Sequence, residues 1–397
     1  MTKTNQKIPV GWSVDEFGKI AFLSKEKYIP SPNEHMKCLE LEHLEKETGQ
    51  LKGYIDSALQ SSAKNRFKKG DVLYGKLRSY LKKYTLASFD GVCSTEIWVL
   101  RGWQEKLINI YLYLIIQTNK FNTACSVSTG THMPRADWEY VSNIPFMYPP
   151  LPEQEKIAEI LSCWDEGIEK LSALIEKKKL QKKALMQKLL TGKHRLKGFS
   201  TPWHEVRLGD ICLLISGNAF SSDDFQVTGI PLIRISNIDG KNIILDEDTV
   251  YLPNDFLDKY SNFIIQPKDL LLAMSGATTG KMGVNKYFFP MLLNQRVCII
   301  RANKTIQDFI NQYLLQYNNK ILKMSYGGAQ PNIGSADIKK IKLYLPSSLA
   351  EQKAIADILS KADAEIELLN KKLAAFNLEK KAMMQKLLTG QIRVKVN

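Results

Sequence analysis

The sequence has little of the chemistry on which most enzymes depend. Its 397 residues include six cysteines and five histidines. The cysteines form neither a C-x-x-C pair nor a cluster with histidine, so neither a zinc site nor a disulfide framework is predicted. No G-x-G-x-x-G turn follows a strand-like segment, as a dinucleotide or methyl-donor pocket would need. The carboxylates lack the spacing of a metal-dependent nuclease, and His132 has no sequence neighbour that would orient it as a base. We therefore expect no catalytic residue, no metal and no cofactor in this chain.

A loop of small residues, Ser275 to Lys281, comes closest to a known ligand-binding motif. A phosphate-binding P-loop has four residues between its glycines and a Ser or Thr after its lysine. Here the interval from Gly276 to Gly280 is one residue too short, and Met282 stands where the magnesium ligand belongs. The loop is therefore not interpreted as a nucleotide site.

Long hydrophobic runs are missing as well. No stretch of about 18 apolar residues occurs, and the start, MTKTNQKIPVGW, lacks the apolar centre of a secretory signal. We expect a cytoplasmic protein without a membrane anchor. What the chain does have is positive charge, with 55 Lys and Arg against 41 Asp and Glu, a net charge of +14. Such an excess favours a polyanionic partner, although a basic protein with no nucleic-acid role remains an alternative.

The chain carries a long internal repeat. The stretch from Glu153 to Arg195 recurs, diverged, from Glu351 to Arg393, at a constant offset of 351 − 153 = 198 residues. About half of the aligned positions are identical, and no gap interrupts the alignment. Solenoid repeats have periods of roughly 20–50 residues. This longer period therefore indicates two equivalent halves, each a domain followed by a helix.

The repeated element is predicted to be a helix of about 40 residues, or about 60 Å at 1.5 Å per residue. Its apolar residues alternate in steps of four and three, a period of 3.5 that is typical of a helix supercoiled with a partner. Proline and glutamate in the first turn, and Thr-Gly after the last, are common helix boundaries. The predicted seam residues are Ile157, Leu161, Trp164, Ile168 and Leu171 in the first copy, and Ile355, Leu359, Ile366 and Leu369 in the second.

The partner of each helix is predicted to be the other copy. Two equivalent halves related by a pseudo-two-fold axis place equivalent helices head to tail, so the pair should be an antiparallel coiled coil. Two alternatives are that each helix packs against its own globular domain or that it drives homodimerisation. The predicted fold class is thus α+β: two pseudo-symmetric mixed α/β domains, residues 1–150 and 196–345, each followed by a spacer helix, residues 151–195 and 346–397.

The two globular segments match each other only at scattered positions. Between these positions they share almost nothing, as expected if a common scaffold carries two different surfaces. The clearest matches are Trp12 with Trp203, Gly70-Asp71 with Lys268-Asp269, and Leu100-Arg101 with Ile300-Arg301.

This duplicated order resembles the specificity subunits of type I restriction-modification systems. The resemblance covers essentially the whole chain and rests on Glu153-Gln154, the helix terminus Gln187 to Gly192, their second copies, and Gln330-Pro331-Asn332. The first half departs from the family pattern, because Thr131-His132-Met133-Pro134-Arg135 replaces a Gln-Pro-Asn-type loop.

The resemblance implies a target-recognition domain in each half, each reading one part of a bipartite site in double-stranded DNA. The paired helices would set the spacing and dock the methyltransferase subunits. It also implies two methyltransferase subunits, which carry S-adenosylmethionine and methylate adenine, and ATP-dependent motor-nuclease subunits in a larger complex. The chain itself would be non-catalytic, and its partners would hold S-adenosylmethionine, ATP and magnesium.

Candidate DNA contacts follow from residue type within these domains, since Lys and Arg suit phosphates and Arg, Asn and Gln suit base edges. For phosphates we predict Lys76, Arg78, Lys82 and Lys83 in the first domain, and Arg234 and Lys281 in the second. For bases we predict His132 and Arg135 in the first, and Ser275, Thr278, Gln295, Gln330 and Asn332 in the second. Two rival hypotheses are a stand-alone DNA-modifying enzyme and a coiled-coil scaffold without DNA affinity.

Overall fold

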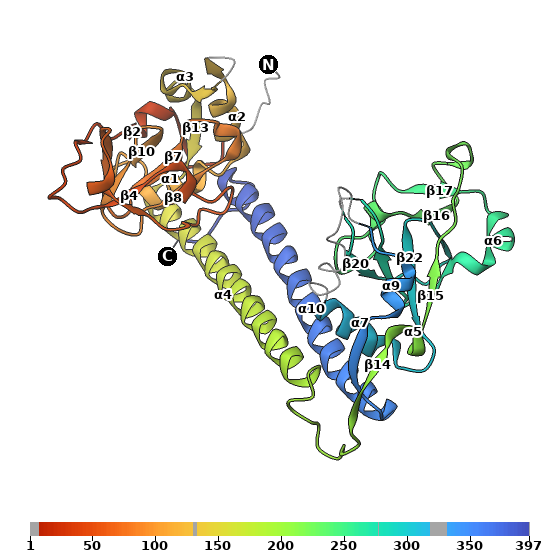
Figure 1. Ribbon diagram of the computed structural model, residues 1–397. Coiled ribbons are helices and arrows are strands. Elements are labelled where there is room, and N and C mark those ends of the chain that lie inside the picture. Colours follow the sequence, from red (N-terminus) through yellow and green to blue (C-terminus); the bar gives the residue numbers. More distant parts are fainter. Residues whose placement is uncertain (1–7, 130–132, 277, 318–331, 397) are drawn as a thin grey trace. The chain divides into compact units, whose positions relative to one another are not determined.

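The computed structural model describes residues 8–129, 133–276, 278–317 and 332–396 (Figure 1). These residues divide into two compact units. The first unit combines residues 1–172 with 371–397, and the second is formed by residues 173–370. Each unit therefore contains one globular domain, part of the helix that follows it, and part of the helix from the other half of the sequence.

The first domain consists of short strands with three small helices. Its strands are β1 (Ser13–Glu16), β2 (Ala21–Leu23), β3 (Lys27–Tyr28), β4 (Lys37–Leu39), β5 (Ile55–Asp56), β6 (Lys64–Phe67), β7 (Val72–Gly75), β8 (Tyr84–Leu86), β9 (Gly91–Ser94), β10 (Ile97–Gly102), β11 (Ser128–Thr129), β12 (Arg135–Ala136) and β13 (Pro145–Tyr148). Its helices are α1 (Asn109–Ile115), α2 (Asn119–Ser126) and α3 (Trp138–Ser142).

Two sheets form the body of this domain, in the orders β2-β10-β7-β8 and β3-β6-β9-β4-β5. Strand β7 lacks a polar face, since every residue of β7 is buried. The reason is that successive side chains point to opposite faces of a strand, and both faces are covered. Val72 and Tyr74 enter the core that includes α1 and α2, whereas Leu73 enters a second core with residues of β4 and β9.

The second domain is built in the same way. Its strands are β14 (Trp203–Arg207), β15 (Cys212–Ser216), β16 (Ile230–Ile233), β17 (Val250–Leu252), β18 (Ile264–Ile265), β19 (Leu270–Ala273), β20 (Met282–Val284), β21 (Met291–Leu293), β22 (Val297–Ala302) and β23 (Lys342–Pro346). Its helices are α5 (Leu208–Ile211), α6 (Phe256–Lys259), α7 (Gln307–Gln316) and α9 (Ser335–Lys339).

The duplication therefore includes the sheet topology, although the sequences of the two domains share little. The order β15-β22-β19-β20 repeats β2-β10-β7-β8, and the pair β14-β23 repeats β1-β13. Each domain also has a single parallel pair among its described strands, β4 with β9 and β16 with β21. The register is kept too, because Val72 faces Leu100 as Leu270 faces Ile300.

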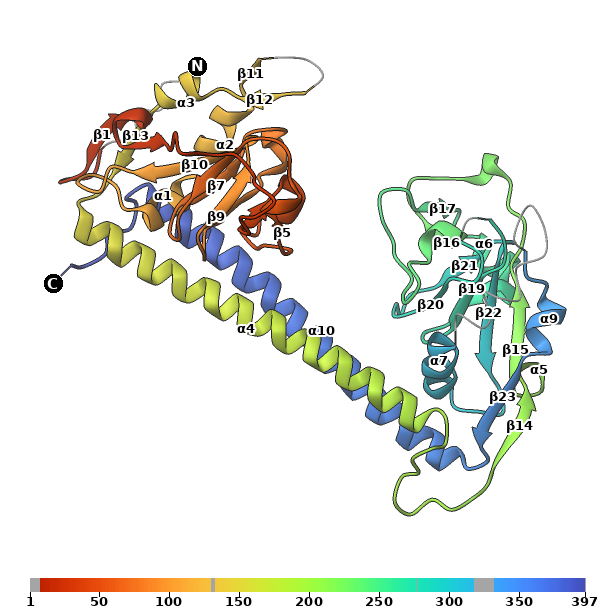
Figure 2. The same ribbon diagram turned by 60° about the vertical axis from the view of Figure 1, so that its left-hand side comes forward.

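The two long helices are α4 (Leu151–Leu189) and α10 (Leu349–Leu388), and segments of both lie side by side within each unit (Figure 2). In the first unit Trp164 of α4 packs edge-on against Phe376 of α10, with ring centroids 5.6 Å apart. In the second, Lys182 of α4 pairs with Asp363 of α10 at 2.6 Å. Both helices are followed by glycine in the left-handed conformation, Gly192 at φ 69° and Gly390 at φ 68°. The predicted antiparallel pairing and helix ends are confirmed.

The predicted seam has two functions along its length. Its central residues Trp164, Ile168 and Leu171 are half-buried in the helix pair. At the helix starts the seam enters the domain cores instead: Ile157 and Leu161 belong to the main core of the first domain, together with Leu387 from the end of α10. Ile355 and Leu359 enter the main core of the second domain. The alternative that each helix packs on its own domain is therefore also correct, at those ends.

Candidate nucleic-acid interface

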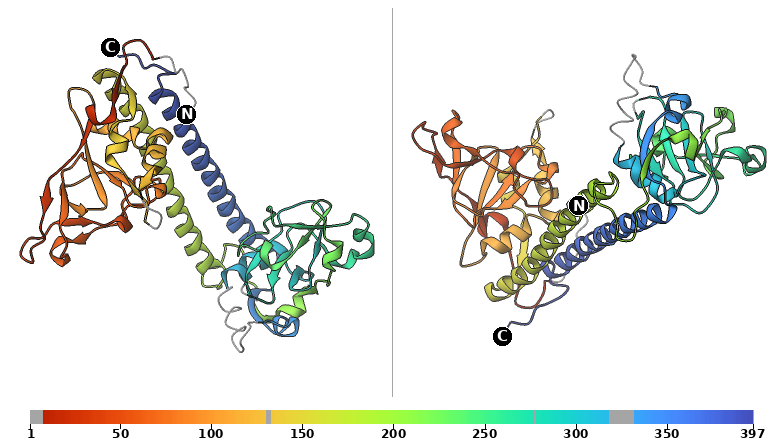
Figure 3. Two further views of the ribbon diagram at one scale, coloured as in Figure 1. Left: turned by 90° about the horizontal axis from the view of Figure 1, so that it is seen from above. Right: turned by 60° about the horizontal axis from the view of Figure 1, so that its bottom comes forward.

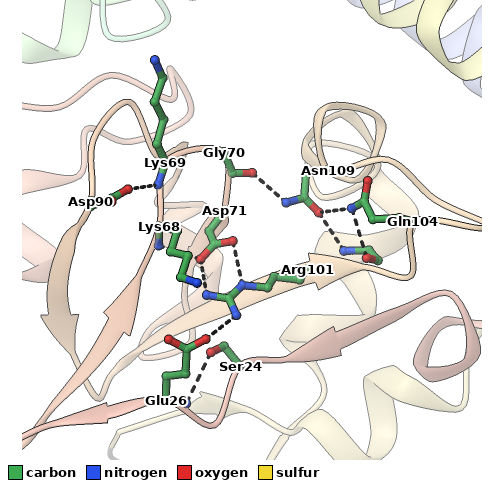
Figure 4. A network of polar contacts seen from close by, with 11 residues as sticks. Ser24, Glu26, Lys68, Lys69, Gly70, Asp71, Asp90, Arg101, Gln104 and Asn109 are labelled. Carbon is green, nitrogen blue, oxygen red and sulfur yellow. Dashed lines mark hydrogen bonds and ion pairs between the residues drawn. The ribbon is translucent and has the colours of Figure 1, made fainter.

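A largely buried ion pair stabilises two neighbouring strands of each domain, β7 with β10 in the first and β19 with β22 in the second. We call these paired strands the frame of the domain. In the first, Arg101 of β10 binds both carboxylate oxygens of Asp71, each at 2.8 Å, and also contacts Glu26 at 2.5 Å (Figure 4). The hydrogen bond from Arg101 holds the pKa of Glu26 below its usual value. The second domain repeats the clamp, with Arg301 donating to Asp269 at 2.8 and 2.6 Å. These are the Asp and Arg positions matched from sequence, and their role is structural.

At one end of this frame, three separate segments of the first domain meet. The loop after β7 donates the amide of Arg78 to the carbonyl of Pro134 at 2.8 Å, and the amide of Ala136 donates back to the carbonyl of Lys76 at 2.9 Å. The amide of Lys76 donates in turn to the carbonyl of Glu96 at 2.9 Å. Backbone pairing therefore brings together Lys76, Arg78 and Arg135, which the sequence analysis selected from two distant segments.

The same arrangement recurs in the second domain. The amide of Ile333 donates to the carbonyl of Met274 at 2.9 Å, and the amide of Met274 donates to the carbonyl of Arg296 at 2.9 Å. Ser275 forms a bridge with Asn332, as Leu77 does with Arg135. Arg135 and Asn332 consequently occupy equivalent positions in the two domains, as do Glu96 and Arg296. The frame is the same, and the side chains it presents differ in charge and type.

The predicted cations of the first domain differ in how free they are to bind a ligand. Arg78 is exposed, in the left-handed conformation at φ 51°. Lys82 pairs with Glu47 at 2.9 Å, and its hydrogen bond lowers the pKa of that carboxyl. Lys83 donates its ammonium to the carbonyl of Leu41 at 2.5 Å, and burial lowers the pKa of Lys83. Its inward direction was not foreseen from the sequence. The assignment of Lys83 to a phosphate stays an untested prediction, and the hydrogen bond to Leu41 argues against it.

Arg135 is exposed and pairs with Glu96 through its Nε atom at 2.9 Å, a hydrogen bond that raises the pKa of the guanidinium. The neighbouring carboxylate orients the side chain without covering it. His132, selected beside Arg135, and Gln330, selected beside Asn332, lie outside the described residues.

In the second domain, the hydroxyl oxygens of Ser275 and Thr278 are buried and have no hydrogen-bond partner among the described residues. Lys281, Gln295 and Asn332 are exposed. Buried polar atoms are nearly always hydrogen-bonded in folded proteins, so the two hydroxyls are suited to meeting a ligand.

Two more cations of the second domain are Arg234, which the sequence analysis selected, and Arg296, which it missed. Arg234 donates its Nη2 atom to the carbonyl of Asp248 at 2.8 Å. Arg296 is exposed beside Gln295. Its only signal in the sequence is a basic residue in the turn that precedes a buried strand.

The helix ends are joined to the domains by a three-residue junction that occurs twice. Glu153 at the start of α4 accepts hydrogen bonds from Arg393 at 2.7 and 2.8 Å and from the indole of Trp12 at 3.2 Å. The C-terminal tail thereby returns to the first domain (Figure 3). There Arg393 also donates a hydrogen bond to the carbonyl of Val10. In the second unit Glu351, Arg195 and Trp203 form the same junction.

Possible metal ligands and thiol nucleophiles are the remaining groups that a catalyst could use among the described residues. No three His, Cys, Asp or Glu side chains gather there as metal ligands, and no described helix is long and apolar enough to cross a membrane. Five of the cysteines are buried, and burial raises the pKa of Cys38 to about 11. A thiol with such a pKa is a poor nucleophile near neutral pH.

A duplicated α+β frame that presents different side chains at equivalent loop ends is the architecture of a two-site recognition protein. The comparisons identify the family. Residues 9–181 and 201–377 match the type I restriction modification DNA specificity domain, and the chain belongs to this family. The chain is a specificity subunit with two target-recognition domains, which confirms the identification made from the sequence.

Individual relatives agree with this assignment. The chain is 32% identical to the type I restriction enzyme MjaVIII specificity subunit of Methanocaldococcus jannaschii, over 77% of this chain and 75% of that protein. In fold it is similar to a chain from a type I restriction-modification assembly, with a TM-score of 0.62 at 20% identity over 97% of this chain and 100% of that one. The S subunit from M. genitalium gives a TM-score of 0.63 at 17% identity, covering 97% and 98%.

Proposed function

We propose that each domain reads one half of a split sequence in double-stranded DNA, and that the reading surface is the loop end where three segments meet. The observation that carries this proposal is the equivalence of Arg135 with Asn332 on a duplicated backbone frame. Arg and Asn form different bidentate pairs in the major groove, Arg with guanine and Asn with adenine. To recognise two different half-sites, the two domains need the same backbone arrangement with different base-contacting side chains.

Phosphate contacts would surround this surface and would position the domain without adding sequence information. In the first domain, Arg78 and Lys76 lie on the same loop as the reading surface. In the second, Lys281 closes the loop that carries Ser275 and Thr278, with its amide bonded to the carbonyl of Thr278 at 2.9 Å.

We further propose that the chain acts without chemistry of its own, in the cytoplasm, and that two methyltransferase subunits and the motor-nuclease subunits supply the reaction. S-adenosylmethionine, ATP and magnesium would then bind to those partners. The helices α4 and α10, of 39 and 40 residues, support a role as a spacer between the half-sites. Each corresponds to about 60 Å at 1.5 Å per residue, and half-sites one DNA turn apart are separated by about 34–36 Å.

The test compares Arg135→Ala and Asn332→Ala in the complex of this chain with its methyltransferase subunit. Methylome sequencing of cells carrying each variant should show relaxed specificity at one position, in a different half of the motif for each variant. In direct binding, each lost base contact should cost about 1–3 kcal/mol. Unchanged motifs in both variants would refute the proposed reading surface. Methyl transfer by the purified chain alone would instead support a stand-alone enzyme.

A further inference from the structure

The turns that lead into β10 and β22 have the same conformation in the two domains. In the first domain the amide of Glu96 donates to the hydroxyl of Ser94 at 3.4 Å. In the second domain the amide of Arg296 donates to the side-chain oxygen of Asn294 at 3.5 Å. The carbonyls of Glu96 and Arg296 also accept from equivalent loop amides, each at 2.9 Å. One backbone position therefore carries a carboxylate in the first domain and a guanidinium in the second.

The surroundings of this position are otherwise alike. It precedes a fully buried strand residue, Ile97 in the first domain and Val297 in the second. These two residues face Gly75 and Ala273 of the neighbouring strands. The common fold therefore gives no reason for opposite charges. The charge belongs to what differs between the two domains, which under the proposed function is the half-site that each one reads.

The side chains at this position have unused hydrogen-bonding capacity. The Oε2 atom of Glu96 accepts from Nε of Arg135 at 2.9 Å, whereas its Oε1 atom has no donor among the described residues. Both Nη atoms of Arg135 likewise lack an acceptor there. The side chains of Glu96 and Arg135 are 26% and 45% exposed, so a ligand can reach both. The guanidinium of Arg296 is exposed and makes no hydrogen bond or ion pair with any described side chain.

A carboxylate and a guanidinium select different bases. DNA phosphates repel a carboxylate, so it is favourable at this surface only where it receives a hydrogen bond. In the major groove cytosine presents an amino donor and no acceptor. Adenine presents its donor beside the acceptor N7, and guanine and thymine present acceptors. Cytosine is therefore the base that suits the free oxygen of Glu96. A guanidinium has donors only, and it pairs with O6 and N7 of guanine.

We propose that Glu96 and Arg296 are specificity-determining residues, with Glu96 selecting cytosine in the first half-site and Arg296 selecting guanine in the second. This inference rests on the proposed function, which pairs Arg135 with guanine and Asn332 with adenine. Glu96 and Arg135 touch each other, so their bases lie in adjoining base pairs, which are about 3.4 Å apart. The first half-site should then contain two adjoining G·C pairs, one read through guanine and one through cytosine. The second should contain a G·C pair near an A·T pair.

The test uses the complex of this chain with its methyltransferase subunit. Methylome sequencing gives the motif, and binding to duplexes with single base-pair changes gives the discrimination at each position. Glu96→Gln keeps the shape of the side chain, but an amide donates as well as accepts. The preference for G·C at one position of the first half-site should therefore fall by about tenfold. Arg296→Gln should have a similar effect at one position of the second half-site and none in the first.

A double variant separates base reading by Glu96 from a purely orienting role towards Arg135. If Glu96 only orients Arg135, Glu96→Gln has no further effect once Arg135 is replaced by alanine. Arg135→Ala and the double variant would then relax the same single position, and this result would overturn the assignment of Glu96. If Glu96 reads its own base, the double variant relaxes two adjoining positions.

Matched controls are Glu105→Gln and Lys304→Gln. Both residues are exposed and follow β10 and β22, so they lie at the opposite strand ends from Glu96 and Arg296. The controls should leave the motif and the discrimination unchanged, and circular dichroism should show that all variants are folded. Equal relaxation by the controls would show a general effect of charge and refute the inference.

Failure of the proposed function has a different outcome from failure of this inference. A wild-type complex without a split motif would refute the proposed function. A split motif that Arg135→Ala relaxes, but that Glu96→Gln and Arg296→Gln leave intact, would refute this inference alone.

Discussion

The two equivalent ion pairs between α4 and α10 should differ strongly in their effect on stability. In the second unit the carboxylate of Asp363 accepts hydrogen bonds from Lys182 at 2.6 Å, Gln312 at 2.9 Å and Lys241 at 3.1 Å. In the first unit Asp165 pairs with Lys380. The side chain of Asp363 is 23% exposed, whereas that of Asp165 is 48% exposed.

The pKa shifts within the Lys182–Asp363 pair show which partner depends on the other. Burial by itself would raise the pKa of Asp363, but hydrogen bonds from Lys182 and Gln312 hold it below its ordinary value. Burial lowers the pKa of Lys182, and the bond to Asp363 only partly offsets this. The carboxylate of Asp363 thus has three donors, whereas the ammonium of Lys182 has a single hydrogen-bond acceptor among the described residues. Removing the acceptor should therefore cost more than removing the lysine.

We expect Asp363→Asn to destabilise the second unit by about 2–3 kcal/mol, because it leaves a mostly buried ammonium without its counter-charge. Lys182→Met should cost at most about 1 kcal/mol, since methionine fits an apolar seam and Asp363 keeps Gln312 and Lys241. Asp165→Asn should also cost under about 1 kcal/mol, because water screens a half-exposed pair.

Calorimetric melting at pH 7 measures these differences. In a unit of this size, 1 kcal/mol shifts the melting temperature by about 2–4 °C, so Asp363→Asn should lower it by about 4–12 °C. The pH dependence follows from the lowered pKa of Asp363. Its contribution is complete above the unfolded carboxyl pKa of about 3.9 and is lost as the pH falls through the lower folded value. The reasoning is refuted if Asp165→Asn or Lys182→Met lowers the melting temperature as much as Asp363→Asn.

Two further predictions concern DNA. Arg78→Gln should reduce the slope of log affinity against log salt by about 0.9, as for one lost phosphate contact. Lys83→Met should leave the slope unchanged, because the ammonium of Lys83 is hydrogen-bonded to the carbonyl of Leu41. Equal slopes in salt titrations of the two variants would contradict this difference. Inserting one heptad into each helix, after Ser172 and after Asn370, keeps the seam in phase and adds about 10 Å at 1.5 Å per residue. The spacer of the methylated motif should then lengthen by about three base pairs at 3.4 Å each, and an unchanged motif in methylome sequencing would exclude a spacer role for the helices.

Features set by local periodicity were readable from the sequence. The seam from Ile157 to Leu171 and the capping glycines depend on neighbours one or two turns away, so their spacing alone defines them. Asp71 and Arg101 each match a residue of the second half of the sequence. No sequence pattern, however, indicated that the two residues form an ion pair with each other. This pairing required the strands β7 and β10 to be placed side by side.

Other assignments could not be made from local patterns. The candidate DNA-contacting residues of the first domain come from the loop after β7 and from β12. Backbone hydrogen bonds bring these two distant segments together. The equivalence of Arg135 with Asn332 follows from those bridges and not from similar residues. Lys83 is as basic as Arg78 in the sequence, and only the fold shows that its ammonium points inward.

The sequence by itself determined the duplication, the long helices, their seam and the family. It did so because helical periodicity and repeated motifs involve residues close together or at a constant offset. Tertiary structure decided that each unit is completed by the helix end from the other half, that the ends of the seam belong to domain cores, and that different side chains occupy one loop position in the two domains. These depend on contacts between residues far apart in the chain, which strand and helix patterns leave open.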